Sequence, residues 1–327
     1  MENQIPAFLH DLLADEYEPD TLETILDGYR KAAKRPITLR ANTLKMDSDA
    51  VATELDAHKI RHARVPWYHD AFVLDGSVDI RRIWDLDIYK SGSIYLQSLS
   101  SMLPPLVLSP RPALDILDMC AAPGGKTAQM AALTEGKGRF TACELHGPRA
   151  EKLRYNLEKQ GAENINVMQT DARKLDEFFR FDQILLDAPC TGTGITYAGD
   201  ERAAKRITPA LLKKVTKSQR ALLDRGLTVL KAGGTLVYST CSILEEENAQ
   251  QVLAALKSHR DCELVPIMTE KPADAEQLDK VIVLPRAIEE TFPLPLLPSS
   301  LPGTLTVAPN EHFEGFFVAA IKKRTAR

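Results

Sequence analysis

The sequence lacks the features that mark membrane-spanning, secreted and metal-binding proteins. No apolar run among its 327 residues approaches the roughly 20 residues that a membrane-spanning helix needs. The stretch MENQIPAFLHDLLADEYEPD at the start is acidic and does not have the basic-then-apolar layout of a signal peptide. The cysteines are odd in number and without the close spacing of a zinc site: Cys120, Cys143, Cys190, Cys241 and Cys262. We therefore expect a cytoplasmic protein with free thiols, no metal and no membrane partner.

Two common nucleotide-binding motifs are also absent. Residues 118–129, DMCAAPGGKTAQ, contain GGKT as a phosphate-binding loop does, but that loop needs a glycine where this chain has Cys120. The dinucleotide pattern G-x-G-x-x-G is missing as well. What remains is a tight turn of small residues that opens a helix, whose free N–H groups suit a carboxylate or another anion.

The chain is long for one domain and short for three, which favours one large α/β domain with a smaller partner. The first 105 residues predict a small α/β or α+β module, with a helix over 5–33, a strand within 35–44, a helix near 47–58 and strands within 61–74. A further helix is expected within 98–112, interrupted by Pro104 and Pro105. We place the domain boundary here, between domains of residues 1–105 and 106–327.

From residue 113 onward, short apolar segments alternate with helical ones. Strands are expected at 113–120, 139–145, 164–171, 183–189 and 235–241. Helices are expected at 127–134, 148–160, 209–231 and 245–258. A turn at Gly233-Gly234 would end the third of these helices. This alternation predicts a parallel sheet with helices on both faces. A last strand is expected at 315–323, after a proline-rich stretch, 285–309, that we expect to be loop.

Acidic and sulphur-bearing side chains gather at the carboxyl ends of these strands: Asp118, Cys120, Glu144, Asp171, Asp187, Cys190 and Cys241. Open α/β sheets bind their ligands at this edge. Glu144 suits a ribose with two free hydroxyls, and Asp171 can accept a hydrogen bond from the amine of adenine. Together with a turn that can bind a carboxylate, these acids match the ribose, the adenine and the amino-acid tail of S-adenosylmethionine. The alternative is that each acid only caps a helix.

Charge is unevenly distributed along a chain whose net charge is −4. Residues 1–28 carry acidic side chains and no Lys or Arg, whereas 30–64 and 202–225 are rich in Lys and Arg. Basic stretches on an acidic protein can follow the phosphates of a nucleic acid. They can equally be the solvated faces of helices, and charge alone leaves both interpretations open.

Several motifs together resemble the NSUN (Sun/Nop) family of RNA cytosine-5 methyltransferases: RANTLK at 40–45, CAAPGGKT at 120–127, DAPCTGTG at 187–194, YSTCS at 238–242 followed by EEEN, and EGFFVAAIKK at 314–323. The resemblance extends from about residue 35 to the C-terminus. Two cysteine motifs in this order are specific, because other methyltransferases on this fold lack the pair. The chain departs from the family after Gln97, where relatives usually have an acid and this chain has Ser98.

The resemblance implies a doubly wound, mostly parallel, seven-stranded Rossmann-like methyltransferase sheet behind an RNA-contacting N-terminal module. The implied cofactor is S-adenosylmethionine. Its implied contacts are Cys120, Ala121, Ala122, Pro123, Gly124, Gly125, Lys126, Glu144, Asp171 and Asp187. The implied partner is RNA, with ribosomal RNA slightly preferred over transfer RNA.

Methylation of cytosine at carbon 5 would use both Cys190 and Cys241. Carbon 5 is a poor nucleophile until a thiolate adds at carbon 6 and an acid supports ring nitrogen 3. By the resemblance, Cys241 attacks, Cys190 assists product release, and Asp187 faces ring nitrogen 3. Lys126 would approach the base or help to hold the thiolate. The competing interpretation of either cysteine is a small buried apolar residue, which is common for free cysteine.

Two other functions stay open. The chain could be a catalytically silent RNA-binding or ribosome-assembly factor on the same fold, although intact Cys190 and Cys241 argue against this. It could instead methylate a DNA cytosine or a protein side chain. The DNA enzymes place their nucleophile in a Pro-Cys segment after the fourth strand, which would make Cys190 the nucleophile and Cys241 spare.

Overall fold

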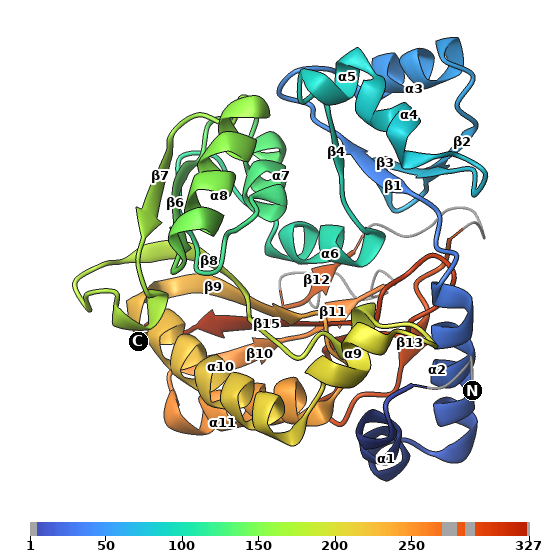
Figure 1. Ribbon diagram of the computed structural model, residues 1–327. Helices are drawn as coiled ribbons and strands as arrows, with labels where there is room; N and C mark the ends of the chain where they lie inside the picture. Colours follow the sequence, from blue (N-terminus) through green and yellow to red (C-terminus); the bar gives the residue numbers. More distant parts are fainter. Residues whose placement is uncertain (1–4, 270–279, 285–291, 326–327) are drawn as a thin grey trace.

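The computed structural model describes residues 5–269, 280–284 and 292–325, and its centre is a nine-stranded sheet (Figure 1). Along the sheet the strands follow the order β13-β14-β15-β9-β8-β5-β6-β7, and β10 pairs with β15. The strands from β5 to β9 are parallel to one another, and β15 runs antiparallel to β9. Their bounds are β5 (Asp115–Asp118), β6 (Arg139–Glu144), β7 (Ile165–Gln169), β8 (Phe181–Asp187), β9 (Leu230–Thr240), β10 (Cys262–Val265), β13 (Leu296–Leu297), β14 (Leu305–Val307) and β15 (Phe316–Lys323).

Helices cover both faces of this sheet (Figure 1). One face carries α6 (Leu99–Leu108), α7 (Gly125–Leu133) and α8 (Gly147–Lys159), and the other carries α10 (Pro209–Val229) and α11 (Ala249–Ser258). Alternate strand residues enter the two cores, since Leu185 packs with the first set and Ile184 and Leu186 pack with the second. The expected doubly wound, mostly parallel α/β sheet is thereby confirmed.

The N-terminal part forms a second, antiparallel sheet of order β2-β3-β1-β4. It lies above the large sheet in Figure 1, with its helices on the far side. Its elements are β1 (Thr38–Ala41), α3 (Ser48–Ala57), β2 (His62–Val65), β3 (Tyr68–Leu74), α4 (Ile80–Asp85), α5 (Asp87–Lys90) and β4 (Ile94–Leu96). The remaining elements are α1 (Ala7–Glu16), α2 (Pro19–Ala32), α9 (Glu201–Arg206), the short helices η1 (Ala172–Lys174), η2 (Thr193–Ile195) and η3 (Glu245–Glu247), and the strand pair β11 (Ile267–Met268) and β12 (Ile282–Val283).

Two expected helices differ at their boundaries. The helix expected over 5–33 is divided in two, because Tyr17 is extended and Pro19 is the first residue of α2, where its missing N–H costs no hydrogen bond. Conversely, α6 continues through Pro104 and Pro105. A proline at 105 leaves the Ser101 carbonyl without its helical donor, and the Gln97 side-chain amide donates to it at 3.2 Å.

The strand count and one turn also differ from expectation. Instead of seven strands the sheet has nine, because β13 and β14 lie in the stretch expected to be loop; residues 285–291 of that stretch lie outside the described residues. The Gly233-Gly234 pair does not end a helix. It lies within β9, where the pairing with β8 shifts between Leu230 and Thr235, so the glycines occupy a bulge.

Candidate active site

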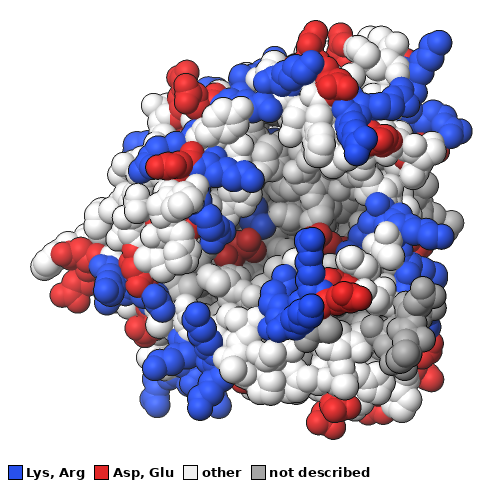
Figure 2. Space-filling view, in the orientation of Figure 1, with Lys and Arg blue, Asp and Glu red and all other residues white. Residues whose placement is uncertain are grey.

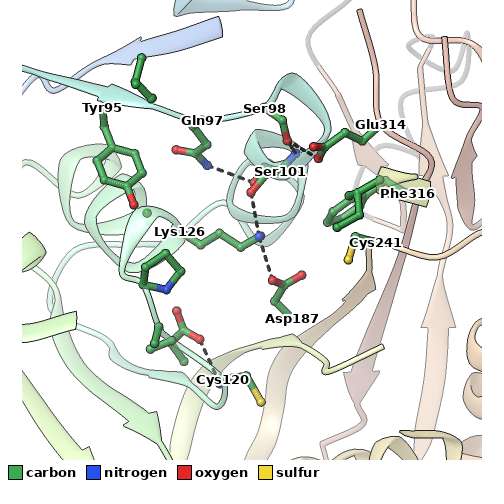
Figure 3. A pocket seen from close by; sticks show the side chains of 17 residues that line it. Tyr95, Gln97, Ser98, Ser101, Cys120, Lys126, Asp187, Cys241, Glu314 and Phe316 are labelled. Carbon is green, nitrogen blue, oxygen red and sulfur yellow. Dashed lines mark hydrogen bonds and ion pairs between the residues drawn. The ribbon is translucent and has the colours of Figure 1, made fainter. Parts of the chain in front are cut away.

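The carboxyl ends of the parallel strands border two adjacent cavities. The inner cavity, of about 320 Å³, is lined by the 120–126 loop, Asp118, Asp187 and Cys241, and by segments around Ser98 and Glu314 (Figure 3). The outer cavity, of about 150 Å³, is lined by Glu144, Asp171 and neighbouring residues. Cys120 lines both cavities, so one elongated ligand can extend through them.

The turn between β5 and α7 is held by a buried carboxylate. Asp118, only 1 % exposed, accepts hydrogen bonds from the Thr127 hydroxyl at 2.7 Å and from the Cys120 N–H at 3.3 Å. Burial raises the pKa of Asp118 to about 6 despite these donors. Gly124, with a φ of 108°, precedes α7 in a conformation that suits only glycine, and α7 then directs its free N–H groups toward the turn.

The two cysteines that the sequence singled out are in contact. Cys241 follows β9, Cys190 lies in the loop after β8, and these strands are parallel neighbours. Their Sγ atoms are 3.0 Å apart. The hydrogen bond to Cys241, together with burial, raises the pKa of the Cys190 thiol well above its usual range. Cys190 therefore keeps its proton and can donate a hydrogen bond to the Cys241 sulphur.

A buried glutamate fixes both cysteine loops, and the sequence analysis did not assign it a role. Glu247 is fully buried, and its Oε1 accepts from the Thr191 N–H at 2.9 Å and from Gln219 at 3.0 Å. Its Oε2 accepts from the hydroxyls of Thr191 at 2.5 Å and Ser242 at 2.6 Å. The only sequence signal was its place in EEEN, six residues after Cys241.

An ion pair occupies the centre of the inner cavity. Lys126 Nζ lies 2.8 Å from Asp187 Oδ2 and donates to the Ser101 hydroxyl at 2.8 Å (Figure 3). Asp187 Oδ1 accepts a hydrogen bond from the Ser239 hydroxyl at 2.8 Å. Burial lowers the pKa of Lys126, but the Asp187 carboxylate outweighs burial and the net shift is upward. The Lys126 ammonium is therefore a hydrogen-bond donor within the inner cavity.

The outer cavity brings the two expected cofactor acids together, each with an arginine that sequence reasoning missed. Glu144, 4 % exposed, accepts from the His146 N–H at 2.8 Å and lies 3.3 Å from Arg149. Asp171 is held by Arg173 through two bonds of 2.8 Å, which lower the pKa of that carboxyl. In each pair the arginine follows the acid by only a few residues, but spacing alone does not separate such pairs from ordinary surface charges.

A carboxylate stands beside the position at which the chain departs from the family pattern. Ser98 donates to Glu314 Oε2 at 2.5 Å (Figure 3). Ser100 donates to the Glu314 carbonyl at 2.7 Å. Glu314 opens the EGFF motif before β15 and lines the inner cavity. A carboxylate from a segment more than two hundred residues away in the chain thus contacts Ser98.

Replacing Gly194 by alanine should lower the free energy of unfolding by about 1–3 kcal/mol, because an added Cβ would lie 1.8 Å from the Gly315 carbonyl oxygen. Gly194 donates to the Cys241 carbonyl at 3.0 Å and accepts from the Gly315 N–H at 2.8 Å, so the clash would also displace the cysteine loop. Urea denaturation measures the change. Gly76→Ala, at a glycine with open space around it, is the matched control and should leave the midpoint unchanged. Equal midpoints for the two variants would contradict this close packing.

The described residues contain neither a membrane-spanning helix nor a group of side chains arranged for a metal ion. No helix there is long and apolar enough to cross a membrane. Within the same part of the chain, no group of three or more His, Cys, Asp and Glu side chains is arranged to hold a metal ion.

Comparison with known proteins matches most of the chain to one family. Residues 105–322 match the family described as 16S rRNA methyltransferase RsmB/F, and residues 5–81 match the RsmF/B-like ferredoxin-like domain. A ribosomal RNA small subunit methyltransferase F from Shewanella loihica is 34 % identical over 320 residues, 94 % of this chain and 60 % of the relative. The chain thus spans about 60 % of the length of that relative.

Solved structures agree with this match. A methyltransferase homologue from Pyrococcus horikoshii is 31 % identical, with a TM-score of 0.72 and coverage of 98 % of this chain and 100 % of that chain. The structure of NSun6 from Pyrococcus horikoshii with SFG has a TM-score of 0.78 and covers 100 % of both chains. At 22 % identity, this second similarity shows the shared fold alone.

Proposed function

Because this chain belongs to the RsmB/F family of 16S rRNA methyltransferases, which confirms its resemblance to the NSUN (Sun/Nop) type, we propose that it methylates carbon 5 of a cytosine in ribosomal RNA. S-adenosylmethionine is the methyl donor. The observation that carries the proposal is the contact of 3.0 Å between Cys190 and Cys241, beside a cavity that also holds Lys126 and Asp187. Cytosine-5 chemistry requires a nucleophile that adds at carbon 6, and a second thiol beside this nucleophile can assist its release.

The residues present fit S-adenosylmethionine. Glu144 faces the outer cavity with a buried carboxylate that suits ribose hydroxyls, and Asp171 lies at the next strand end for the adenine amine. The turn from Cys120 through Ala121, Ala122, Pro123, Gly124 and Gly125 to Lys126 opens α7, whose N-terminus suits the carboxylate of the amino-acid tail. When bound, this cofactor supplies an electrophilic methyl group.

Side chains of the protein have separate roles in the reaction at the cytosine base. The Cys241 thiolate forms a bond to carbon 6, which makes carbon 5 electron-rich. The proton that Lys126 shares with Asp187 is held at ring nitrogen 3, where the ring gains electron density. Once carbon 5 carries the methyl group, its proton passes to solvent water, the electron pair of that carbon–hydrogen bond restores the double bond between carbons 5 and 6, and the bond from carbon 6 to sulphur breaks. The Cys190 thiol, whose Sγ lies 3.0 Å from that of Cys241, stabilises the departing thiolate.

The RNA partner is supported by the distribution of charge around the cavities. Figure 2 shows a hollow between the small and the large sheet, with Lys and Arg side chains around its rim. The basic stretch at 202–225 lies on α9 and α10, and α9 borders this hollow (Figure 1). We assign residues 1–105 as the RNA-contacting module and 106–327 as the methyltransferase domain. The target base is unpaired or flipped out, because a side chain cannot reach carbon 6 inside a stacked helix.

Bisulphite sequencing of cellular RNA tests the proposed function. A strain that lacks the gene should lose one or a few 5-methylcytosines in ribosomal RNA, and the purified protein should restore them with S-adenosylmethionine. Loss from transfer RNA instead would move the substrate without changing the chemistry. Unchanged 5-methylcytosine, with RNA binding retained, would favour the catalytically silent assembly factor.

Asp171→Ala should weaken S-adenosylmethionine binding roughly ten- to a hundredfold, the effect of losing a hydrogen bond to a charged group. Isothermal titration calorimetry measures the dissociation constant directly. Glu177→Ala, at an exposed carboxylate in the following loop, is the matched control and should bind like the unmodified protein. Unchanged affinity of Asp171→Ala would remove this residue from the adenine site and leave it as the partner of Arg173 alone.

A further inference from the structure

A third cavity adjoins the inner one and has no role in the chemistry above. It has a volume of about 180 Å³ and lies between the 89–96 segment and the C-terminal end of α8. Tyr95 and Leu96, on β4, line both this cavity and the inner one, so only one strand separates them. We call it the α8 cavity.

The α8 cavity is basic and has no carboxylate among its lining residues. Lys152, Asn156 and Lys159 project into it from α8. Lys159 Nζ lies 4.2 Å from the centre of the Tyr89 ring, so it is fixed on one wall. Within residues 5–269, 280–284 and 292–325, neither lysine has a carboxylate oxygen within 4.0 Å of its ammonium nitrogen.

The ammonium group of Lys45 adds to the positive charge beside the α8 cavity. Burial, and then the neighbouring Lys45, lower the pKa of Lys159. The repulsion between these like charges would be relieved by an anion in the α8 cavity. A phosphate diester carries one negative charge and four oxygen atoms, and it matches lysines that are spread around a small cavity.

Two side chains of the RANTLK motif, residues 40–45, make hydrogen bonds that join the segments around the α8 cavity. Asn42 donates to the Gly92 carbonyl at 2.8 Å and to the Gln160 carbonyl at 2.7 Å. Lys45 donates to the carbonyls of Ser91 at 2.7 Å and Lys159 at 2.6 Å. The bonds to Gln160 and Lys159 cap carbonyl groups at the end of α8, where the helix dipole alone would repel an anion.

Close packing makes the arrangement rigid. At Gly92, whose φ is +78°, a Cβ would lie 2.2 Å from the Lys159 carbonyl oxygen, so only glycine permits this approach. On the other side, Asn156 donates to the Pro123 carbonyl at 2.7 Å and so connects α8 to the cofactor turn. The α8 cavity therefore has a fixed position relative to the inner cavity.

We propose that the α8 cavity binds a backbone phosphate of the RNA next to the target nucleotide, with Lys152 and Lys159 as its ligands. This inference rests on the proposed function, since it takes the inner cavity as the place of the base. A base that enters the inner cavity leaves its backbone outside, and Tyr95 separates the two places. Contacts to phosphate position a nucleic acid without reading its sequence, so this site sets the register of the strand.

The double variant Lys152→Gln/Lys159→Gln tests the site. With ribosomal RNA from a strain that lacks the gene, KM for RNA should rise about ten- to a hundredfold, while kcat and S-adenosylmethionine affinity stay unchanged. The salt dependence of RNA binding should also weaken, its logarithmic slope falling by about one to two units. Lys152→Arg/Lys159→Arg should retain the KM of the unmodified protein. Lys257→Gln, on α11, is the control for a loss of general charge.

Oligonucleotides in which one phosphate is replaced by an uncharged methylphosphonate identify the phosphate that the α8 cavity binds. In oligonucleotides around the mapped cytosine, one methylphosphonate linkage should weaken binding to the unmodified protein but not to the double glutamine variant. An active enzyme whose KM and salt slope are unchanged by the double variant, or changed equally by Lys257→Gln, overturns the site and leaves the proposed function intact. If the unmodified protein transfers no methyl group, the proposed function fails, and the salt slope of binding alone still decides whether the α8 cavity holds a phosphate.

Discussion

The Cys241→Ala variant is expected to lose methyl transfer by at least about 10⁴-fold while it still binds S-adenosylmethionine and RNA. Carbon 5 of cytosine cannot attack a methyl group until a nucleophile has added at carbon 6, so removal of the thiol removes the activated ring. Single-turnover transfer of a radiolabelled methyl group to RNA measures the loss, because it isolates the chemical step from product release.

Cys262→Ala is the matched control for this experiment. Cys262 is a buried free cysteine on β10, and it packs in the core that α10 and α11 cover. Its replacement should leave the single-turnover rate close to that of the unmodified protein. Activity retained in Cys241→Ala would make Cys190 the nucleophile, as in the DNA enzymes, and would leave Cys241 as a packing residue.

The Cys190→Ala variant should accumulate a covalent complex with RNA that survives denaturing gel electrophoresis, with turnover lowered about 10²- to 10⁴-fold. Cys241 can still attack in this variant, but the departing sulphur has lost the thiol that lies 3.0 Å away. The complex appears as a slowly migrating band that contains both protein and labelled RNA.

The double variant Cys190→Ala/Cys241→Ala is the control for that band and should form none. Normal turnover of Cys190→Ala without a covalent band would refute the release role. The contact between the sulphur atoms would then serve only to hold the proton of the pair on Cys190.

The architecture was predictable because it follows local patterns. Apolar strands that alternate with helices dictate a parallel sheet, and the sheet then brings the ends of β8 and β9 together with their cysteines. By contrast, the small strands β13 and β14 were missed because two or three residues among prolines carry no periodic signal. The division at Tyr17 was missed because both helices bury one continuous stripe of apolar residues.

The candidate site was predictable where a residue sits at a strand end and not where its partner is distant in sequence. Lys126 was expected near the base or the thiolate, and its pairing with Asp187, 61 residues away, depends on the parallel pairing of β8 with β5, the strand that precedes α7. Glu247 and Glu314 are further examples, because their partners Thr191 and Ser98 become neighbours only after folding. Tertiary structure decides such pairs, and one sequence contains no signal for them.

The measurement that tests the account most directly is tandem mass spectrometry of the protein digested from the Cys190→Ala complex with RNA. It identifies which cysteine carries the nucleotide. The account predicts a cytidine adduct on the peptide that contains Cys241 and on no other. An adduct on another cysteine, or a nucleotide joined to the protein through a residue other than cysteine, would contradict it.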